Sequence, residues 1–374
     1  MEKQMSFDQF WKDNDDAQKE NCFNPEATQV AMGILMSDEC VYSELNEKGD
    51  PWGEIDIPRQ FELNKRYNDK AEKIVGRRLL KEIDPKEHVA FPNIKRIGEV
   101  FGGQYLMGVN TGEWLESPIN TPEALERQLE KIDNLDIESF ILPENWEKES
   151  RNIYEKTGKK IEPRRHIRGP VTLATSIFGM ENLVFLSYDS PELFKRFSRT
   201  ILKVVLEINR VIDREAGYTS ETAPSGFSFA DDDCNLMTPE MYKDFGYPVL
   251  KGCFEHYSPN PGDKRYQHSD SAMAHLLPIL GTLDMNGCNF GPTVMVDEIR
   301  KHLPNARIDG CMAPFTFMNN NADEIRKEVK RDCLSIKGTG TRGLNIYTAG
   351  SINNGSSLDS LKVVMETVQE FGQY

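Results

Sequence analysis

The spacing of hydrophobic positions changes repeatedly along the chain between a pattern typical of buried strands and one typical of amphipathic helices. The predicted strands are residues 88–94, 104–109, 170–176, 226–230, 265–268, 282–290, 306–310 and 344–349. The predicted helices lie near residues 121–133, 190–215, 239–257, 270–280, 294–302, 321–333 and 356–371. Strands that alternate with long helical segments predict a parallel sheet covered by helices.

The number of predicted strands favours one α/β architecture. About eight strands in roughly 285 residues fit a (β/α)8 barrel, and a doubly wound open sheet is the alternative. Residues 1–85 are charged and mostly helix-like, with turn residues at 46–53 (NEKGDPWG). We therefore predict an N-terminal helical extension over residues 1–85 and a (β/α)8 barrel over residues 86–374.

Three predicted helices begin with the same short motif. Thr121, Ser190 and Thr238 are each followed by Pro and Glu. A Ser or Thr hydroxyl can accept a free backbone N–H of the first helical turn, Pro has no N–H there, and Glu suits the positive end of the helix. The motif predicts that each of these three residues is a helix N-cap.

Composition excludes several classes of protein. The net charge is −15, from 45 basic and 60 acidic residues, and the basic residues form no long block. We therefore expect no nucleic-acid partner. No apolar stretch is long enough for a transmembrane helix, and the charged N-terminus does not resemble a signal peptide, so we expect a cytoplasmic protein without a membrane partner. The scattered cysteines form no CxxC pair, which argues against a disulfide framework or a zinc finger.

The densest basic cluster comprises Arg164, Arg165, His166 and Arg168. An acidic protein can still bind an anion at a local cluster of this kind. The alternative is a solvated loop before a strand, and the sequence leaves both open. Arg168 is the candidate for contact with an anionic group of a substrate.

Polar residues follow two of the predicted strands, where a barrel places its active site. Asp231, Asp232 and Asp233 follow the strand 226–230, and His268-Ser-Asp270 ends the strand 265–268. Three adjacent carboxylates cannot all be ionised cheaply in a buried cleft unless a cation is present. Either they cap the next segment and face water, or Asp231 or Asp232 binds a metal or a substrate cation.

His268 has two interpretations as well. It is either a hydrogen-bonded wall residue at a strand end or a ligand beside the acidic run. Zinc accepts nitrogen and oxygen ligands, and catalytic zinc sites keep one coordination position open. The sequence therefore marks Asp231, Asp232 and His268 as candidate catalytic residues.

Several segments together resemble the uroporphyrinogen decarboxylase superfamily over roughly residues 88–374. They are the run GPVTLA from Gly169, SPELFKRF, the acidic run with TPEMYKDFGYP, the HSD segment, GPTVMVDEIRKHLPNARIDGCMAPFTF and the C-terminal YTAGSINNGSSLDSLKVVMETVQEFG. The resemblance implies a (β/α)8 fold. It also implies either tetrapyrrole decarboxylation or zinc-dependent methyl transfer that involves corrinoid proteins or thiols.

The decarboxylase branch fits less well. Its RQAGRY-like string is absent, and the aspartate of its FSDIL-like stretch is replaced by Asn93. An amide cannot supply the negative charge that stabilises a protonated pyrrole. We keep Asn93 as a candidate substrate-binding residue, together with Arg168 and Ser351.

The methyltransferase branches differ in their zinc ligands. Thiol-methylating relatives use His-x-Cys and a distant Cys, whereas this chain has His268-x-Asp270 and Ser351 at the matching places. Harder oxygen ligands replace thiolates, which resembles the corrinoid-dependent O-demethylase branch with two acids and one histidine. We predict His268, Asp232 and Asp270 as metal ligands, while Asp231, Asp233 and Asp244 compete for the place of the second acid.

The resemblance implies a methyltransferase that moves a methyl group from a methyl ether or methylamine to a corrinoid protein, assisted by zinc. Its partners would be the small methyl donor and the corrinoid protein. The alternatives are a tetrapyrrole decarboxylase, a metal-free barrel with a binding role, and methyl transfer to a thiol with Cys311 as a zinc ligand. A homodimer stays open, because ordinary apolar helix faces select no interface.

Overall fold

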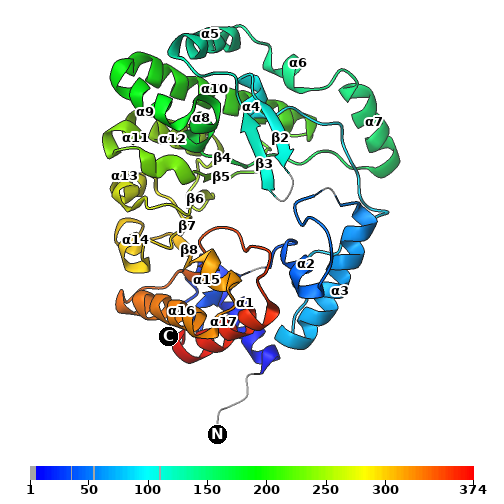
Figure 1. The fold of residues 1–374 in the computed structure, drawn as a ribbon, viewed down its shortest axis with the longest axis vertical. Helices are drawn as coiled ribbons and strands as arrows, with labels where there is room; N and C mark the ends of the chain where they lie inside the picture. Colours follow the sequence, from blue (N-terminus) through cyan, green and yellow to red (C-terminus); the bar gives the residue numbers. More distant parts are fainter. Residues whose placement is uncertain (1–5, 35, 54, 109–110) are drawn as a thin grey trace. The chain divides into compact units, whose positions relative to one another are not determined.

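The computed structural model describes residues 6–34, 36–53, 55–108 and 111–374. The chain divides into two compact units (Figure 1). The first unit comprises Met1–His88, His268–Leu277 and Asp284–Tyr374. The second unit comprises Val89–Gln267 and Pro278–Leu283. The predicted division at residues 85 and 86 is a different partition, and it stays a prediction.

The central element is a seven-stranded sheet in the order β1-β9-β8-β7-β6-β5-β4. Its strands are β1 (Ala31–Met32), β4 (His166–Arg168), β5 (Phe227–Ala230), β6 (Arg265–Ser269), β7 (Gly287–Phe290), β8 (Arg307–Met312) and β9 (Leu344–Thr348). The pairs β1–β9, β4–β5, β7–β8 and β8–β9 are parallel. From β4 to β9 the order follows the sequence without the reversal of a doubly wound sheet, and the first strand pairs with the last. The predicted α/β class with a parallel sheet is confirmed.

The first unit covers its strands with helices from both ends of the chain. These helices are α1 (Phe7–Cys22), α2 (Cys40–Leu45), α3 (Ile57–Val75), α14 (Val296–His302), α15 (Pro314–Met318), α16 (Ala322–Gly338) and α17 (Leu358–Phe371). Asn14 of α1 accepts from the Met32 amide at 2.6 Å and donates to the Met32 carbonyl at 3.0 Å. The segment predicted to be helical therefore also supplies strand β1, which was not predicted.

The second unit contains an antiparallel hairpin and the longest helix of the described residues. The hairpin consists of β2 (Gln104–Gly108) and β3 (Thr111–Glu116). The helices are α4 (Ile97–Val100), α5 (Pro122–Asp133), α6 (Ile137–Ile141), α7 (Trp146–Thr157), α8 (Pro170–Phe178), α9 (Met180–Asp189), α10 (Pro191–Glu215), α11 (Pro239–Asp244) and α12 (Gly246–Tyr257). On α10 the buried Phe194, Phe197, Ile201 and Val205 recur at the spacing of one helix face.

The predicted strand at residues 170–176 is wrong, because these residues form α8. The strand lies earlier in the chain, at His166–Arg168, and pairs with β5. Pro170 occupies the first turn of α8, where its missing N–H costs nothing. A short apolar run such as PVTLATSIF does not distinguish a buried strand from a buried helix by periodicity alone.

Four other predicted elements also differ from the structure. Residues 88–94 have no regular strand, and residues 104–108 form β2 of the antiparallel hairpin, whereas residue 109 lies outside the described residues. The predicted strand 282–290 is reduced to Gly287–Phe290. No helix begins at Asp270, because a short 3₁₀ turn at Ala274–Leu276 leads into the single helical turn α13 (Leu277–Leu280).

The predicted helix starts are correct, but the caps are not all formed. The Thr121 hydroxyl accepts from the Ala124 amide, and the Thr238 hydroxyl accepts from the Met241 amide, both at 3.2 Å. Ser190 precedes α10 without a side-chain capping bond. The motif therefore places a helix start more reliably than it predicts the capping contact.

Among the described residues, no single helix is both long and apolar enough to span a bilayer. The bent pair α8 and α9, with 101° between its halves, meets the length and composition criteria only when the two are taken together. Many apolar residues of α8, including Val171 and Leu173, are buried inside the protein.

Candidate functional site

The acidic run after β5 fixes the start of α8. Asp231 is fully buried, and its Oδ1 accepts from the Thr172 amide at 2.8 Å. Asp233 accepts a hydrogen bond from the Thr175 hydroxyl, and its own amide donates to Thr172 Oγ1 at 2.9 Å. A Cβ on Gly169 would lie 2.2 Å from the Cβ of Asp231, so only glycine permits this close approach. Two of the three acids therefore join β5 to α8.

The environment of Asp231 keeps its side chain partly protonated. Burial raises the pKa of this carboxyl to about 7, the hydrogen bonds from Thr172 lower it, and the charges of Asp232 and Asp233 raise it further. Its Oδ2 atom has no hydrogen-bond partner among the described residues. These contacts indicate a structural role, and the predicted catalytic role of Asp231 stays a prediction.

A buried asparagine on β7 orients His268 of β6. His268 Nδ1 lies 2.6 Å from Asn289 Oδ1, which also accepts from the Gly350 amide at 3.1 Å. Asn289 Nδ2 donates to the Thr348 carbonyl at 3.0 Å and to the Asp309 carbonyl. Because carbonyls only accept, the amide orientation is fixed, and Oδ1 is the acceptor that faces the imidazole.

This hydrogen bond also fixes the tautomer of His268. Since Asn289 Oδ1 can only accept, His268 Nδ1 carries the proton. In the neutral imidazole the lone pair is then on Nε2. Metal-binding histidines are typically held in this way, with one ring N–H donating to an oxygen and the other nitrogen available to the ion.

Asp270 lies next to the turn that follows β9. A Cβ on Gly350 would lie 3.3 Å from Asp270 Oδ2, and Gly350 has a φ of +99° that favours glycine. Ser351 comes next in the chain and is exposed. The turn thus places Asp270 close to Gly350, the residue that precedes Ser351.

The three predicted metal ligands form one group. Asp232, His268 and Asp270 each offer one ligand atom, and these atoms lie within 4.8 Å of one another. Tetrahedral zinc with bonds of about 2.0–2.2 Å places its ligand atoms about 3.4 Å apart, which is shorter than this limit. Two carboxylates and one neutral imidazole suit zinc chemically, and a fourth position would remain for water or substrate.

The competing acids and Cys311 lie in other environments. Asp244 is exposed on α11 and pairs with Lys195 at 3.3 Å. Cys311 is fully buried in β8, and burial raises the pKa of its thiol well above the ordinary value. A thiol that resists ionisation is a poor zinc ligand, because the thiolate is the form that binds metal. Asn93 is exposed in the loop before α4, and its predicted role stays a prediction.

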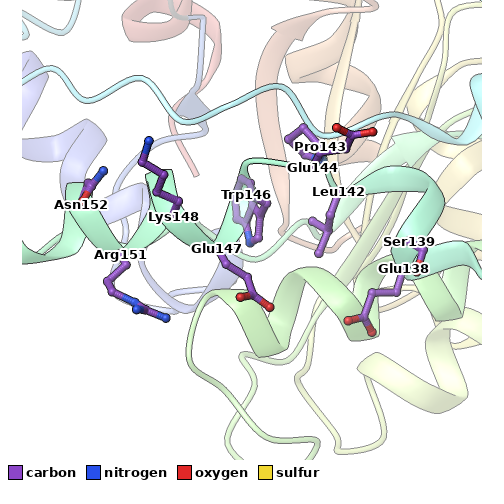
Figure 2. Close-up of a pocket in the computed structure, with 10 residues that line it drawn as sticks. All are labelled: Glu138, Ser139, Leu142, Pro143, Glu144, Trp146, Glu147, Lys148, Arg151 and Asn152. Atoms are coloured by element: carbon purple, nitrogen blue, oxygen red, sulfur yellow. The ribbon is translucent and has the colours of Figure 1, made fainter.

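A cavity of about 550 Å³ is lined by residues of α6, of α7 and of the loop between them. These lining residues are distant in sequence from the predicted site residues. Figure 2 shows Glu138, Trp146 and Glu147 in its lining, with Lys148 and Arg151 pointing in opposite directions. Trp146 is buried and donates to Glu215 at 2.7 Å. None of the residues predicted to be catalytic, metal-binding or substrate-binding lines this cavity.

Asn289 and Thr172 were not predicted as site residues from the sequence. Asn289 is the polar residue in the otherwise small and apolar strand GCNF, and a buried amide in such a strand needs hydrogen-bond partners. Thr172 falls inside the run that was mistaken for a strand. The first residue carried a recognisable signal, and the second did not.

Comparisons with known proteins agree with this fold. The family model for uroporphyrinogen decarboxylase (URO-D) matches residues 75–371. A methyltransferase from Methanosarcina mazei is similar in structure, with a TM-score of 0.57 and 16% identity over 93% of this chain and 95% of that chain. A B12-independent methionine synthase from Shewanella sp. W3-18-1, in complex with selenomethionine, gives a TM-score of 0.38 and 12% identity over 60% and 66%.

The second of these structures is too distant to support a comparison, and no curated protein sequence matches the chain. The structural likeness to the M. mazei protein concerns the fold and agrees with the predicted (β/α)8 class. The family model covers most of the chain, including every predicted metal ligand. The chain therefore belongs to the uroporphyrinogen decarboxylase family.

Proposed function

We propose that this protein is a zinc-dependent methyltransferase that moves a methyl group from a small methyl ether or methylamine to the corrinoid of a partner protein. The observation that carries the proposal is the group Asp232, His268 and Asp270, with ligand atoms within 4.8 Å of one another. Membership of the family and the similar fold of a methyltransferase support it.

The residues present fit a zinc ion both in the types of ligand atom and in the fixed orientation of His268. Asn289 Oδ1 holds His268 through its Nδ1, and the Asn289 amide is itself fixed by bonds to two main-chain carbonyls. When bound, zinc would supply a Lewis acid for the heteroatom that carries the methyl group. Asp232, His268 and Asp270 would hold the ion and leave a position for that heteroatom.

The remaining residues of the acidic run support this arrangement. Asp231 and Asp233 hold α8 against the end of β5, so the residue between them has a fixed backbone position. Asp231 also carries a raised pKa, which limits the negative charge next to Asp232 at neutral pH. A ligand held by a rigid backbone loses less conformational entropy when it binds a metal.

Tetrapyrrole decarboxylation is the less favoured activity. The chain has Asn93 where the decarboxylase stretch has an aspartate, and this residue lies exposed in a loop. An amide does not stabilise a cationic pyrrole. No contact described for Asn93 restores a negative charge at that position.

The test is methyl transfer to free cob(I)alamin by the zinc-loaded full chain, with methoxybenzenes and methylamines as donors. We expect formation of methylcobalamin, followed by its absorbance spectrum, with loss of activity in His268→Ala and in Asp232→Asn. His88→Ala is the matched control, because His88 is exposed and outside the site. Absence of transfer by zinc-loaded protein with every donor, or equal rates in His268→Ala, would contradict the proposal.

A further inference from the structure

A second cavity, of about 380 Å³, lies within the second unit and is lined by three arginines. Its lining residues come from the hairpin β2–β3, from α4, α8 and α10, and from β4 and the residues just before it. The helices α4 and α8 contact the strands β2 and β3, respectively. The residues that define its chemistry are Arg96, Arg164, Arg168, Leu173, Val205 and Ile208.

Arg96 is already neutralised within the protein. Its guanidinium donates to both carboxylate oxygens of Glu113, at 2.5 and 2.7 Å, and lies over the Tyr105 ring at 3.3 Å from the centroid. Glu113 also lines the cavity. This bidentate ion pair fixes the position of Arg96, and its two charges neutralise each other.

Arg164 has no such counter-charge. Its side chain is half-buried, and among the described residues no carboxylate or other acceptor is recorded within bonding distance of its guanidinium. Burial, and then the charge of Arg96, lower the pKa of Arg164. A buried cation without a partner is costly, which is why buried charges in proteins are normally paired.

Arg168 contributes a second unneutralised charge. Its guanidinium donates to the Ser176 hydroxyl at 3.3 Å, and that hydroxyl donates in turn to the Thr172 carbonyl at 2.8 Å. Arg165, the neighbour of Arg164, turns elsewhere and pairs with Asp213 at 2.9 Å. Of the predicted basic cluster, Arg164, His166 and Arg168 thus line the cavity, which has three arginines and one glutamate in its lining.

We propose that this cavity binds the carboxylate of a small organic acid, with its apolar body against Leu173, Val205 and Ile208. The planar guanidinium matches a carboxylate in a bidentate geometry, and Arg164 is positioned to receive it. The three aliphatic side chains are buried and exclude water from one wall. A fixed charge next to an apolar wall selects an amphipathic anion over inorganic phosphate.

The volume restricts the size of the ligand. About 380 Å³ is at the lower end of the range of roughly 300–1,000 Å³ for small-molecule sites. This space suits a single aromatic ring with one carboxylate, whereas a multi-anionic tetrapyrrole would need more room and more cationic partners. The site shares no residue with the proposed metal ligands, so the inference does not depend on zinc or on methyl transfer.

The test is isothermal titration of the zinc-free full chain with benzoate and with its neutral analogue benzamide. We expect benzoate to bind at least about tenfold more tightly than benzamide, because only the anion pairs with Arg164. Arg164→Met, which keeps an unbranched side chain but removes the guanidinium, is expected to weaken benzoate binding by about tenfold or more. Arg127→Met, at an exposed arginine on α5, is the matched control and should bind like the wild type.

Thermal unfolding without ligand gives an independent readout. Arg164→Met should melt at the same or a higher temperature, because the change removes a half-buried cation that has no counter-charge. Arg168→Met serves as the second variant if Arg164→Met does not fold. The proposal is overturned if benzoate does not bind, if benzamide binds equally well, if Arg164→Met and Arg168→Met both bind benzoate like the wild type, or if inorganic phosphate binds at these arginines and benzoate does not.

Discussion

The ends of β5 and β6 both carry polar residues, but the two ends are organised differently. At the end of β5, Asp231 and Asp233 accept hydrogen bonds from the first turns of α8. At the end of β6, His268 is held by Asn289, whose own amide is fixed by two main-chain carbonyls. The first end uses its acids to attach a helix, and the second receives support from a neighbouring strand.

This difference shows how contacts separate structural residues from candidate ligands. In the acidic run, the flanking residues are used by the fold, and the middle residue Asp232 belongs to the potential ligand group. At β6, one ring nitrogen of the histidine donates to Asn289, as is typical of metal-binding histidines. A polar run in the sequence does not show which of its residues are structural and which are candidate ligands, because these roles depend on the hydrogen-bond partners that the fold supplies.

The largest expected effect concerns Asp231 and the pH dependence of stability. Its pKa is about 7 in the folded chain, against an ordinary value of 3.8. As pH rises from about 4 to about 7, the unfolded chain loses this proton while the folded chain keeps it, so the contribution of Asp231 to stability falls and then stays constant. Asp231→Asn removes the titration and should gain up to about 4 kcal/mol relative to the wild type across this window.

The measurement is urea unfolding of the zinc-free protein at several pH values within that window. Asp244→Asn is the matched control, because Asp244 is exposed on α11. It should follow the wild-type pH profile closely. If the difference between Asp231→Asn and the wild type were independent of pH, the buried carboxyl would not titrate as described.

The next largest effect concerns the support of His268. Asn289→Leu removes the acceptor for Nδ1 and should weaken zinc binding by about 10–100-fold, as outer hydrogen-bond partners of metal ligands typically do. Asn14→Leu is a matched control, since Asn14 is buried and bonds the main chain of β1 instead. Competition with a fluorescent zinc chelator measures both affinities. Equal zinc affinities in the two variants would show that Asn289 does not orient the ligand.

The fold was largely predictable from the sequence where periodicity was strong. The helices α5, α10 and α17 and the strands β5, β6, β8 and β9 lie close to their predicted ranges. The errors fall on short apolar or polar runs, where tertiary contacts decide the conformation. The strand β1 is only two residues long, and its pairing with β9 joins distant parts of the sequence.

The candidate site was predictable in its residue types but not in its supporting contacts. His268, Asp232 and Asp270 were marked by their position after strands and by a family resemblance. Asn289 lies far from His268 in sequence, and its role appears only when β7 is placed beside Asp309 and Thr348. The basic cluster in the sequence indicated arginines of the second cavity. It did not indicate Glu113, which lies on the hairpin and carries the opposite charge.

The smallest expected effect is at the attachment of α8. Thr175→Val removes the hydroxyl that donates to Asp233 and should cost about 0.5–1.5 kcal/mol of stability. Zinc affinity should stay unchanged, because Asp233 is outside the ligand group. Denaturant unfolding and zinc titration together check this. A large loss of zinc affinity would show that the contacts that attach α8 at the end of β5 also support the metal ligands.

The central claim is that His268 is a metal ligand rather than a strand-end wall residue. The most direct measurement is the zinc content of purified wild-type protein, His268→Ala and the control His88→Ala by elemental analysis. The account predicts near-stoichiometric zinc in the wild type and in His88→Ala, and its loss in folded His268→Ala. Wild-type protein that stays free of zinc after incubation with the metal, or zinc that persists in His268→Ala, would contradict the account.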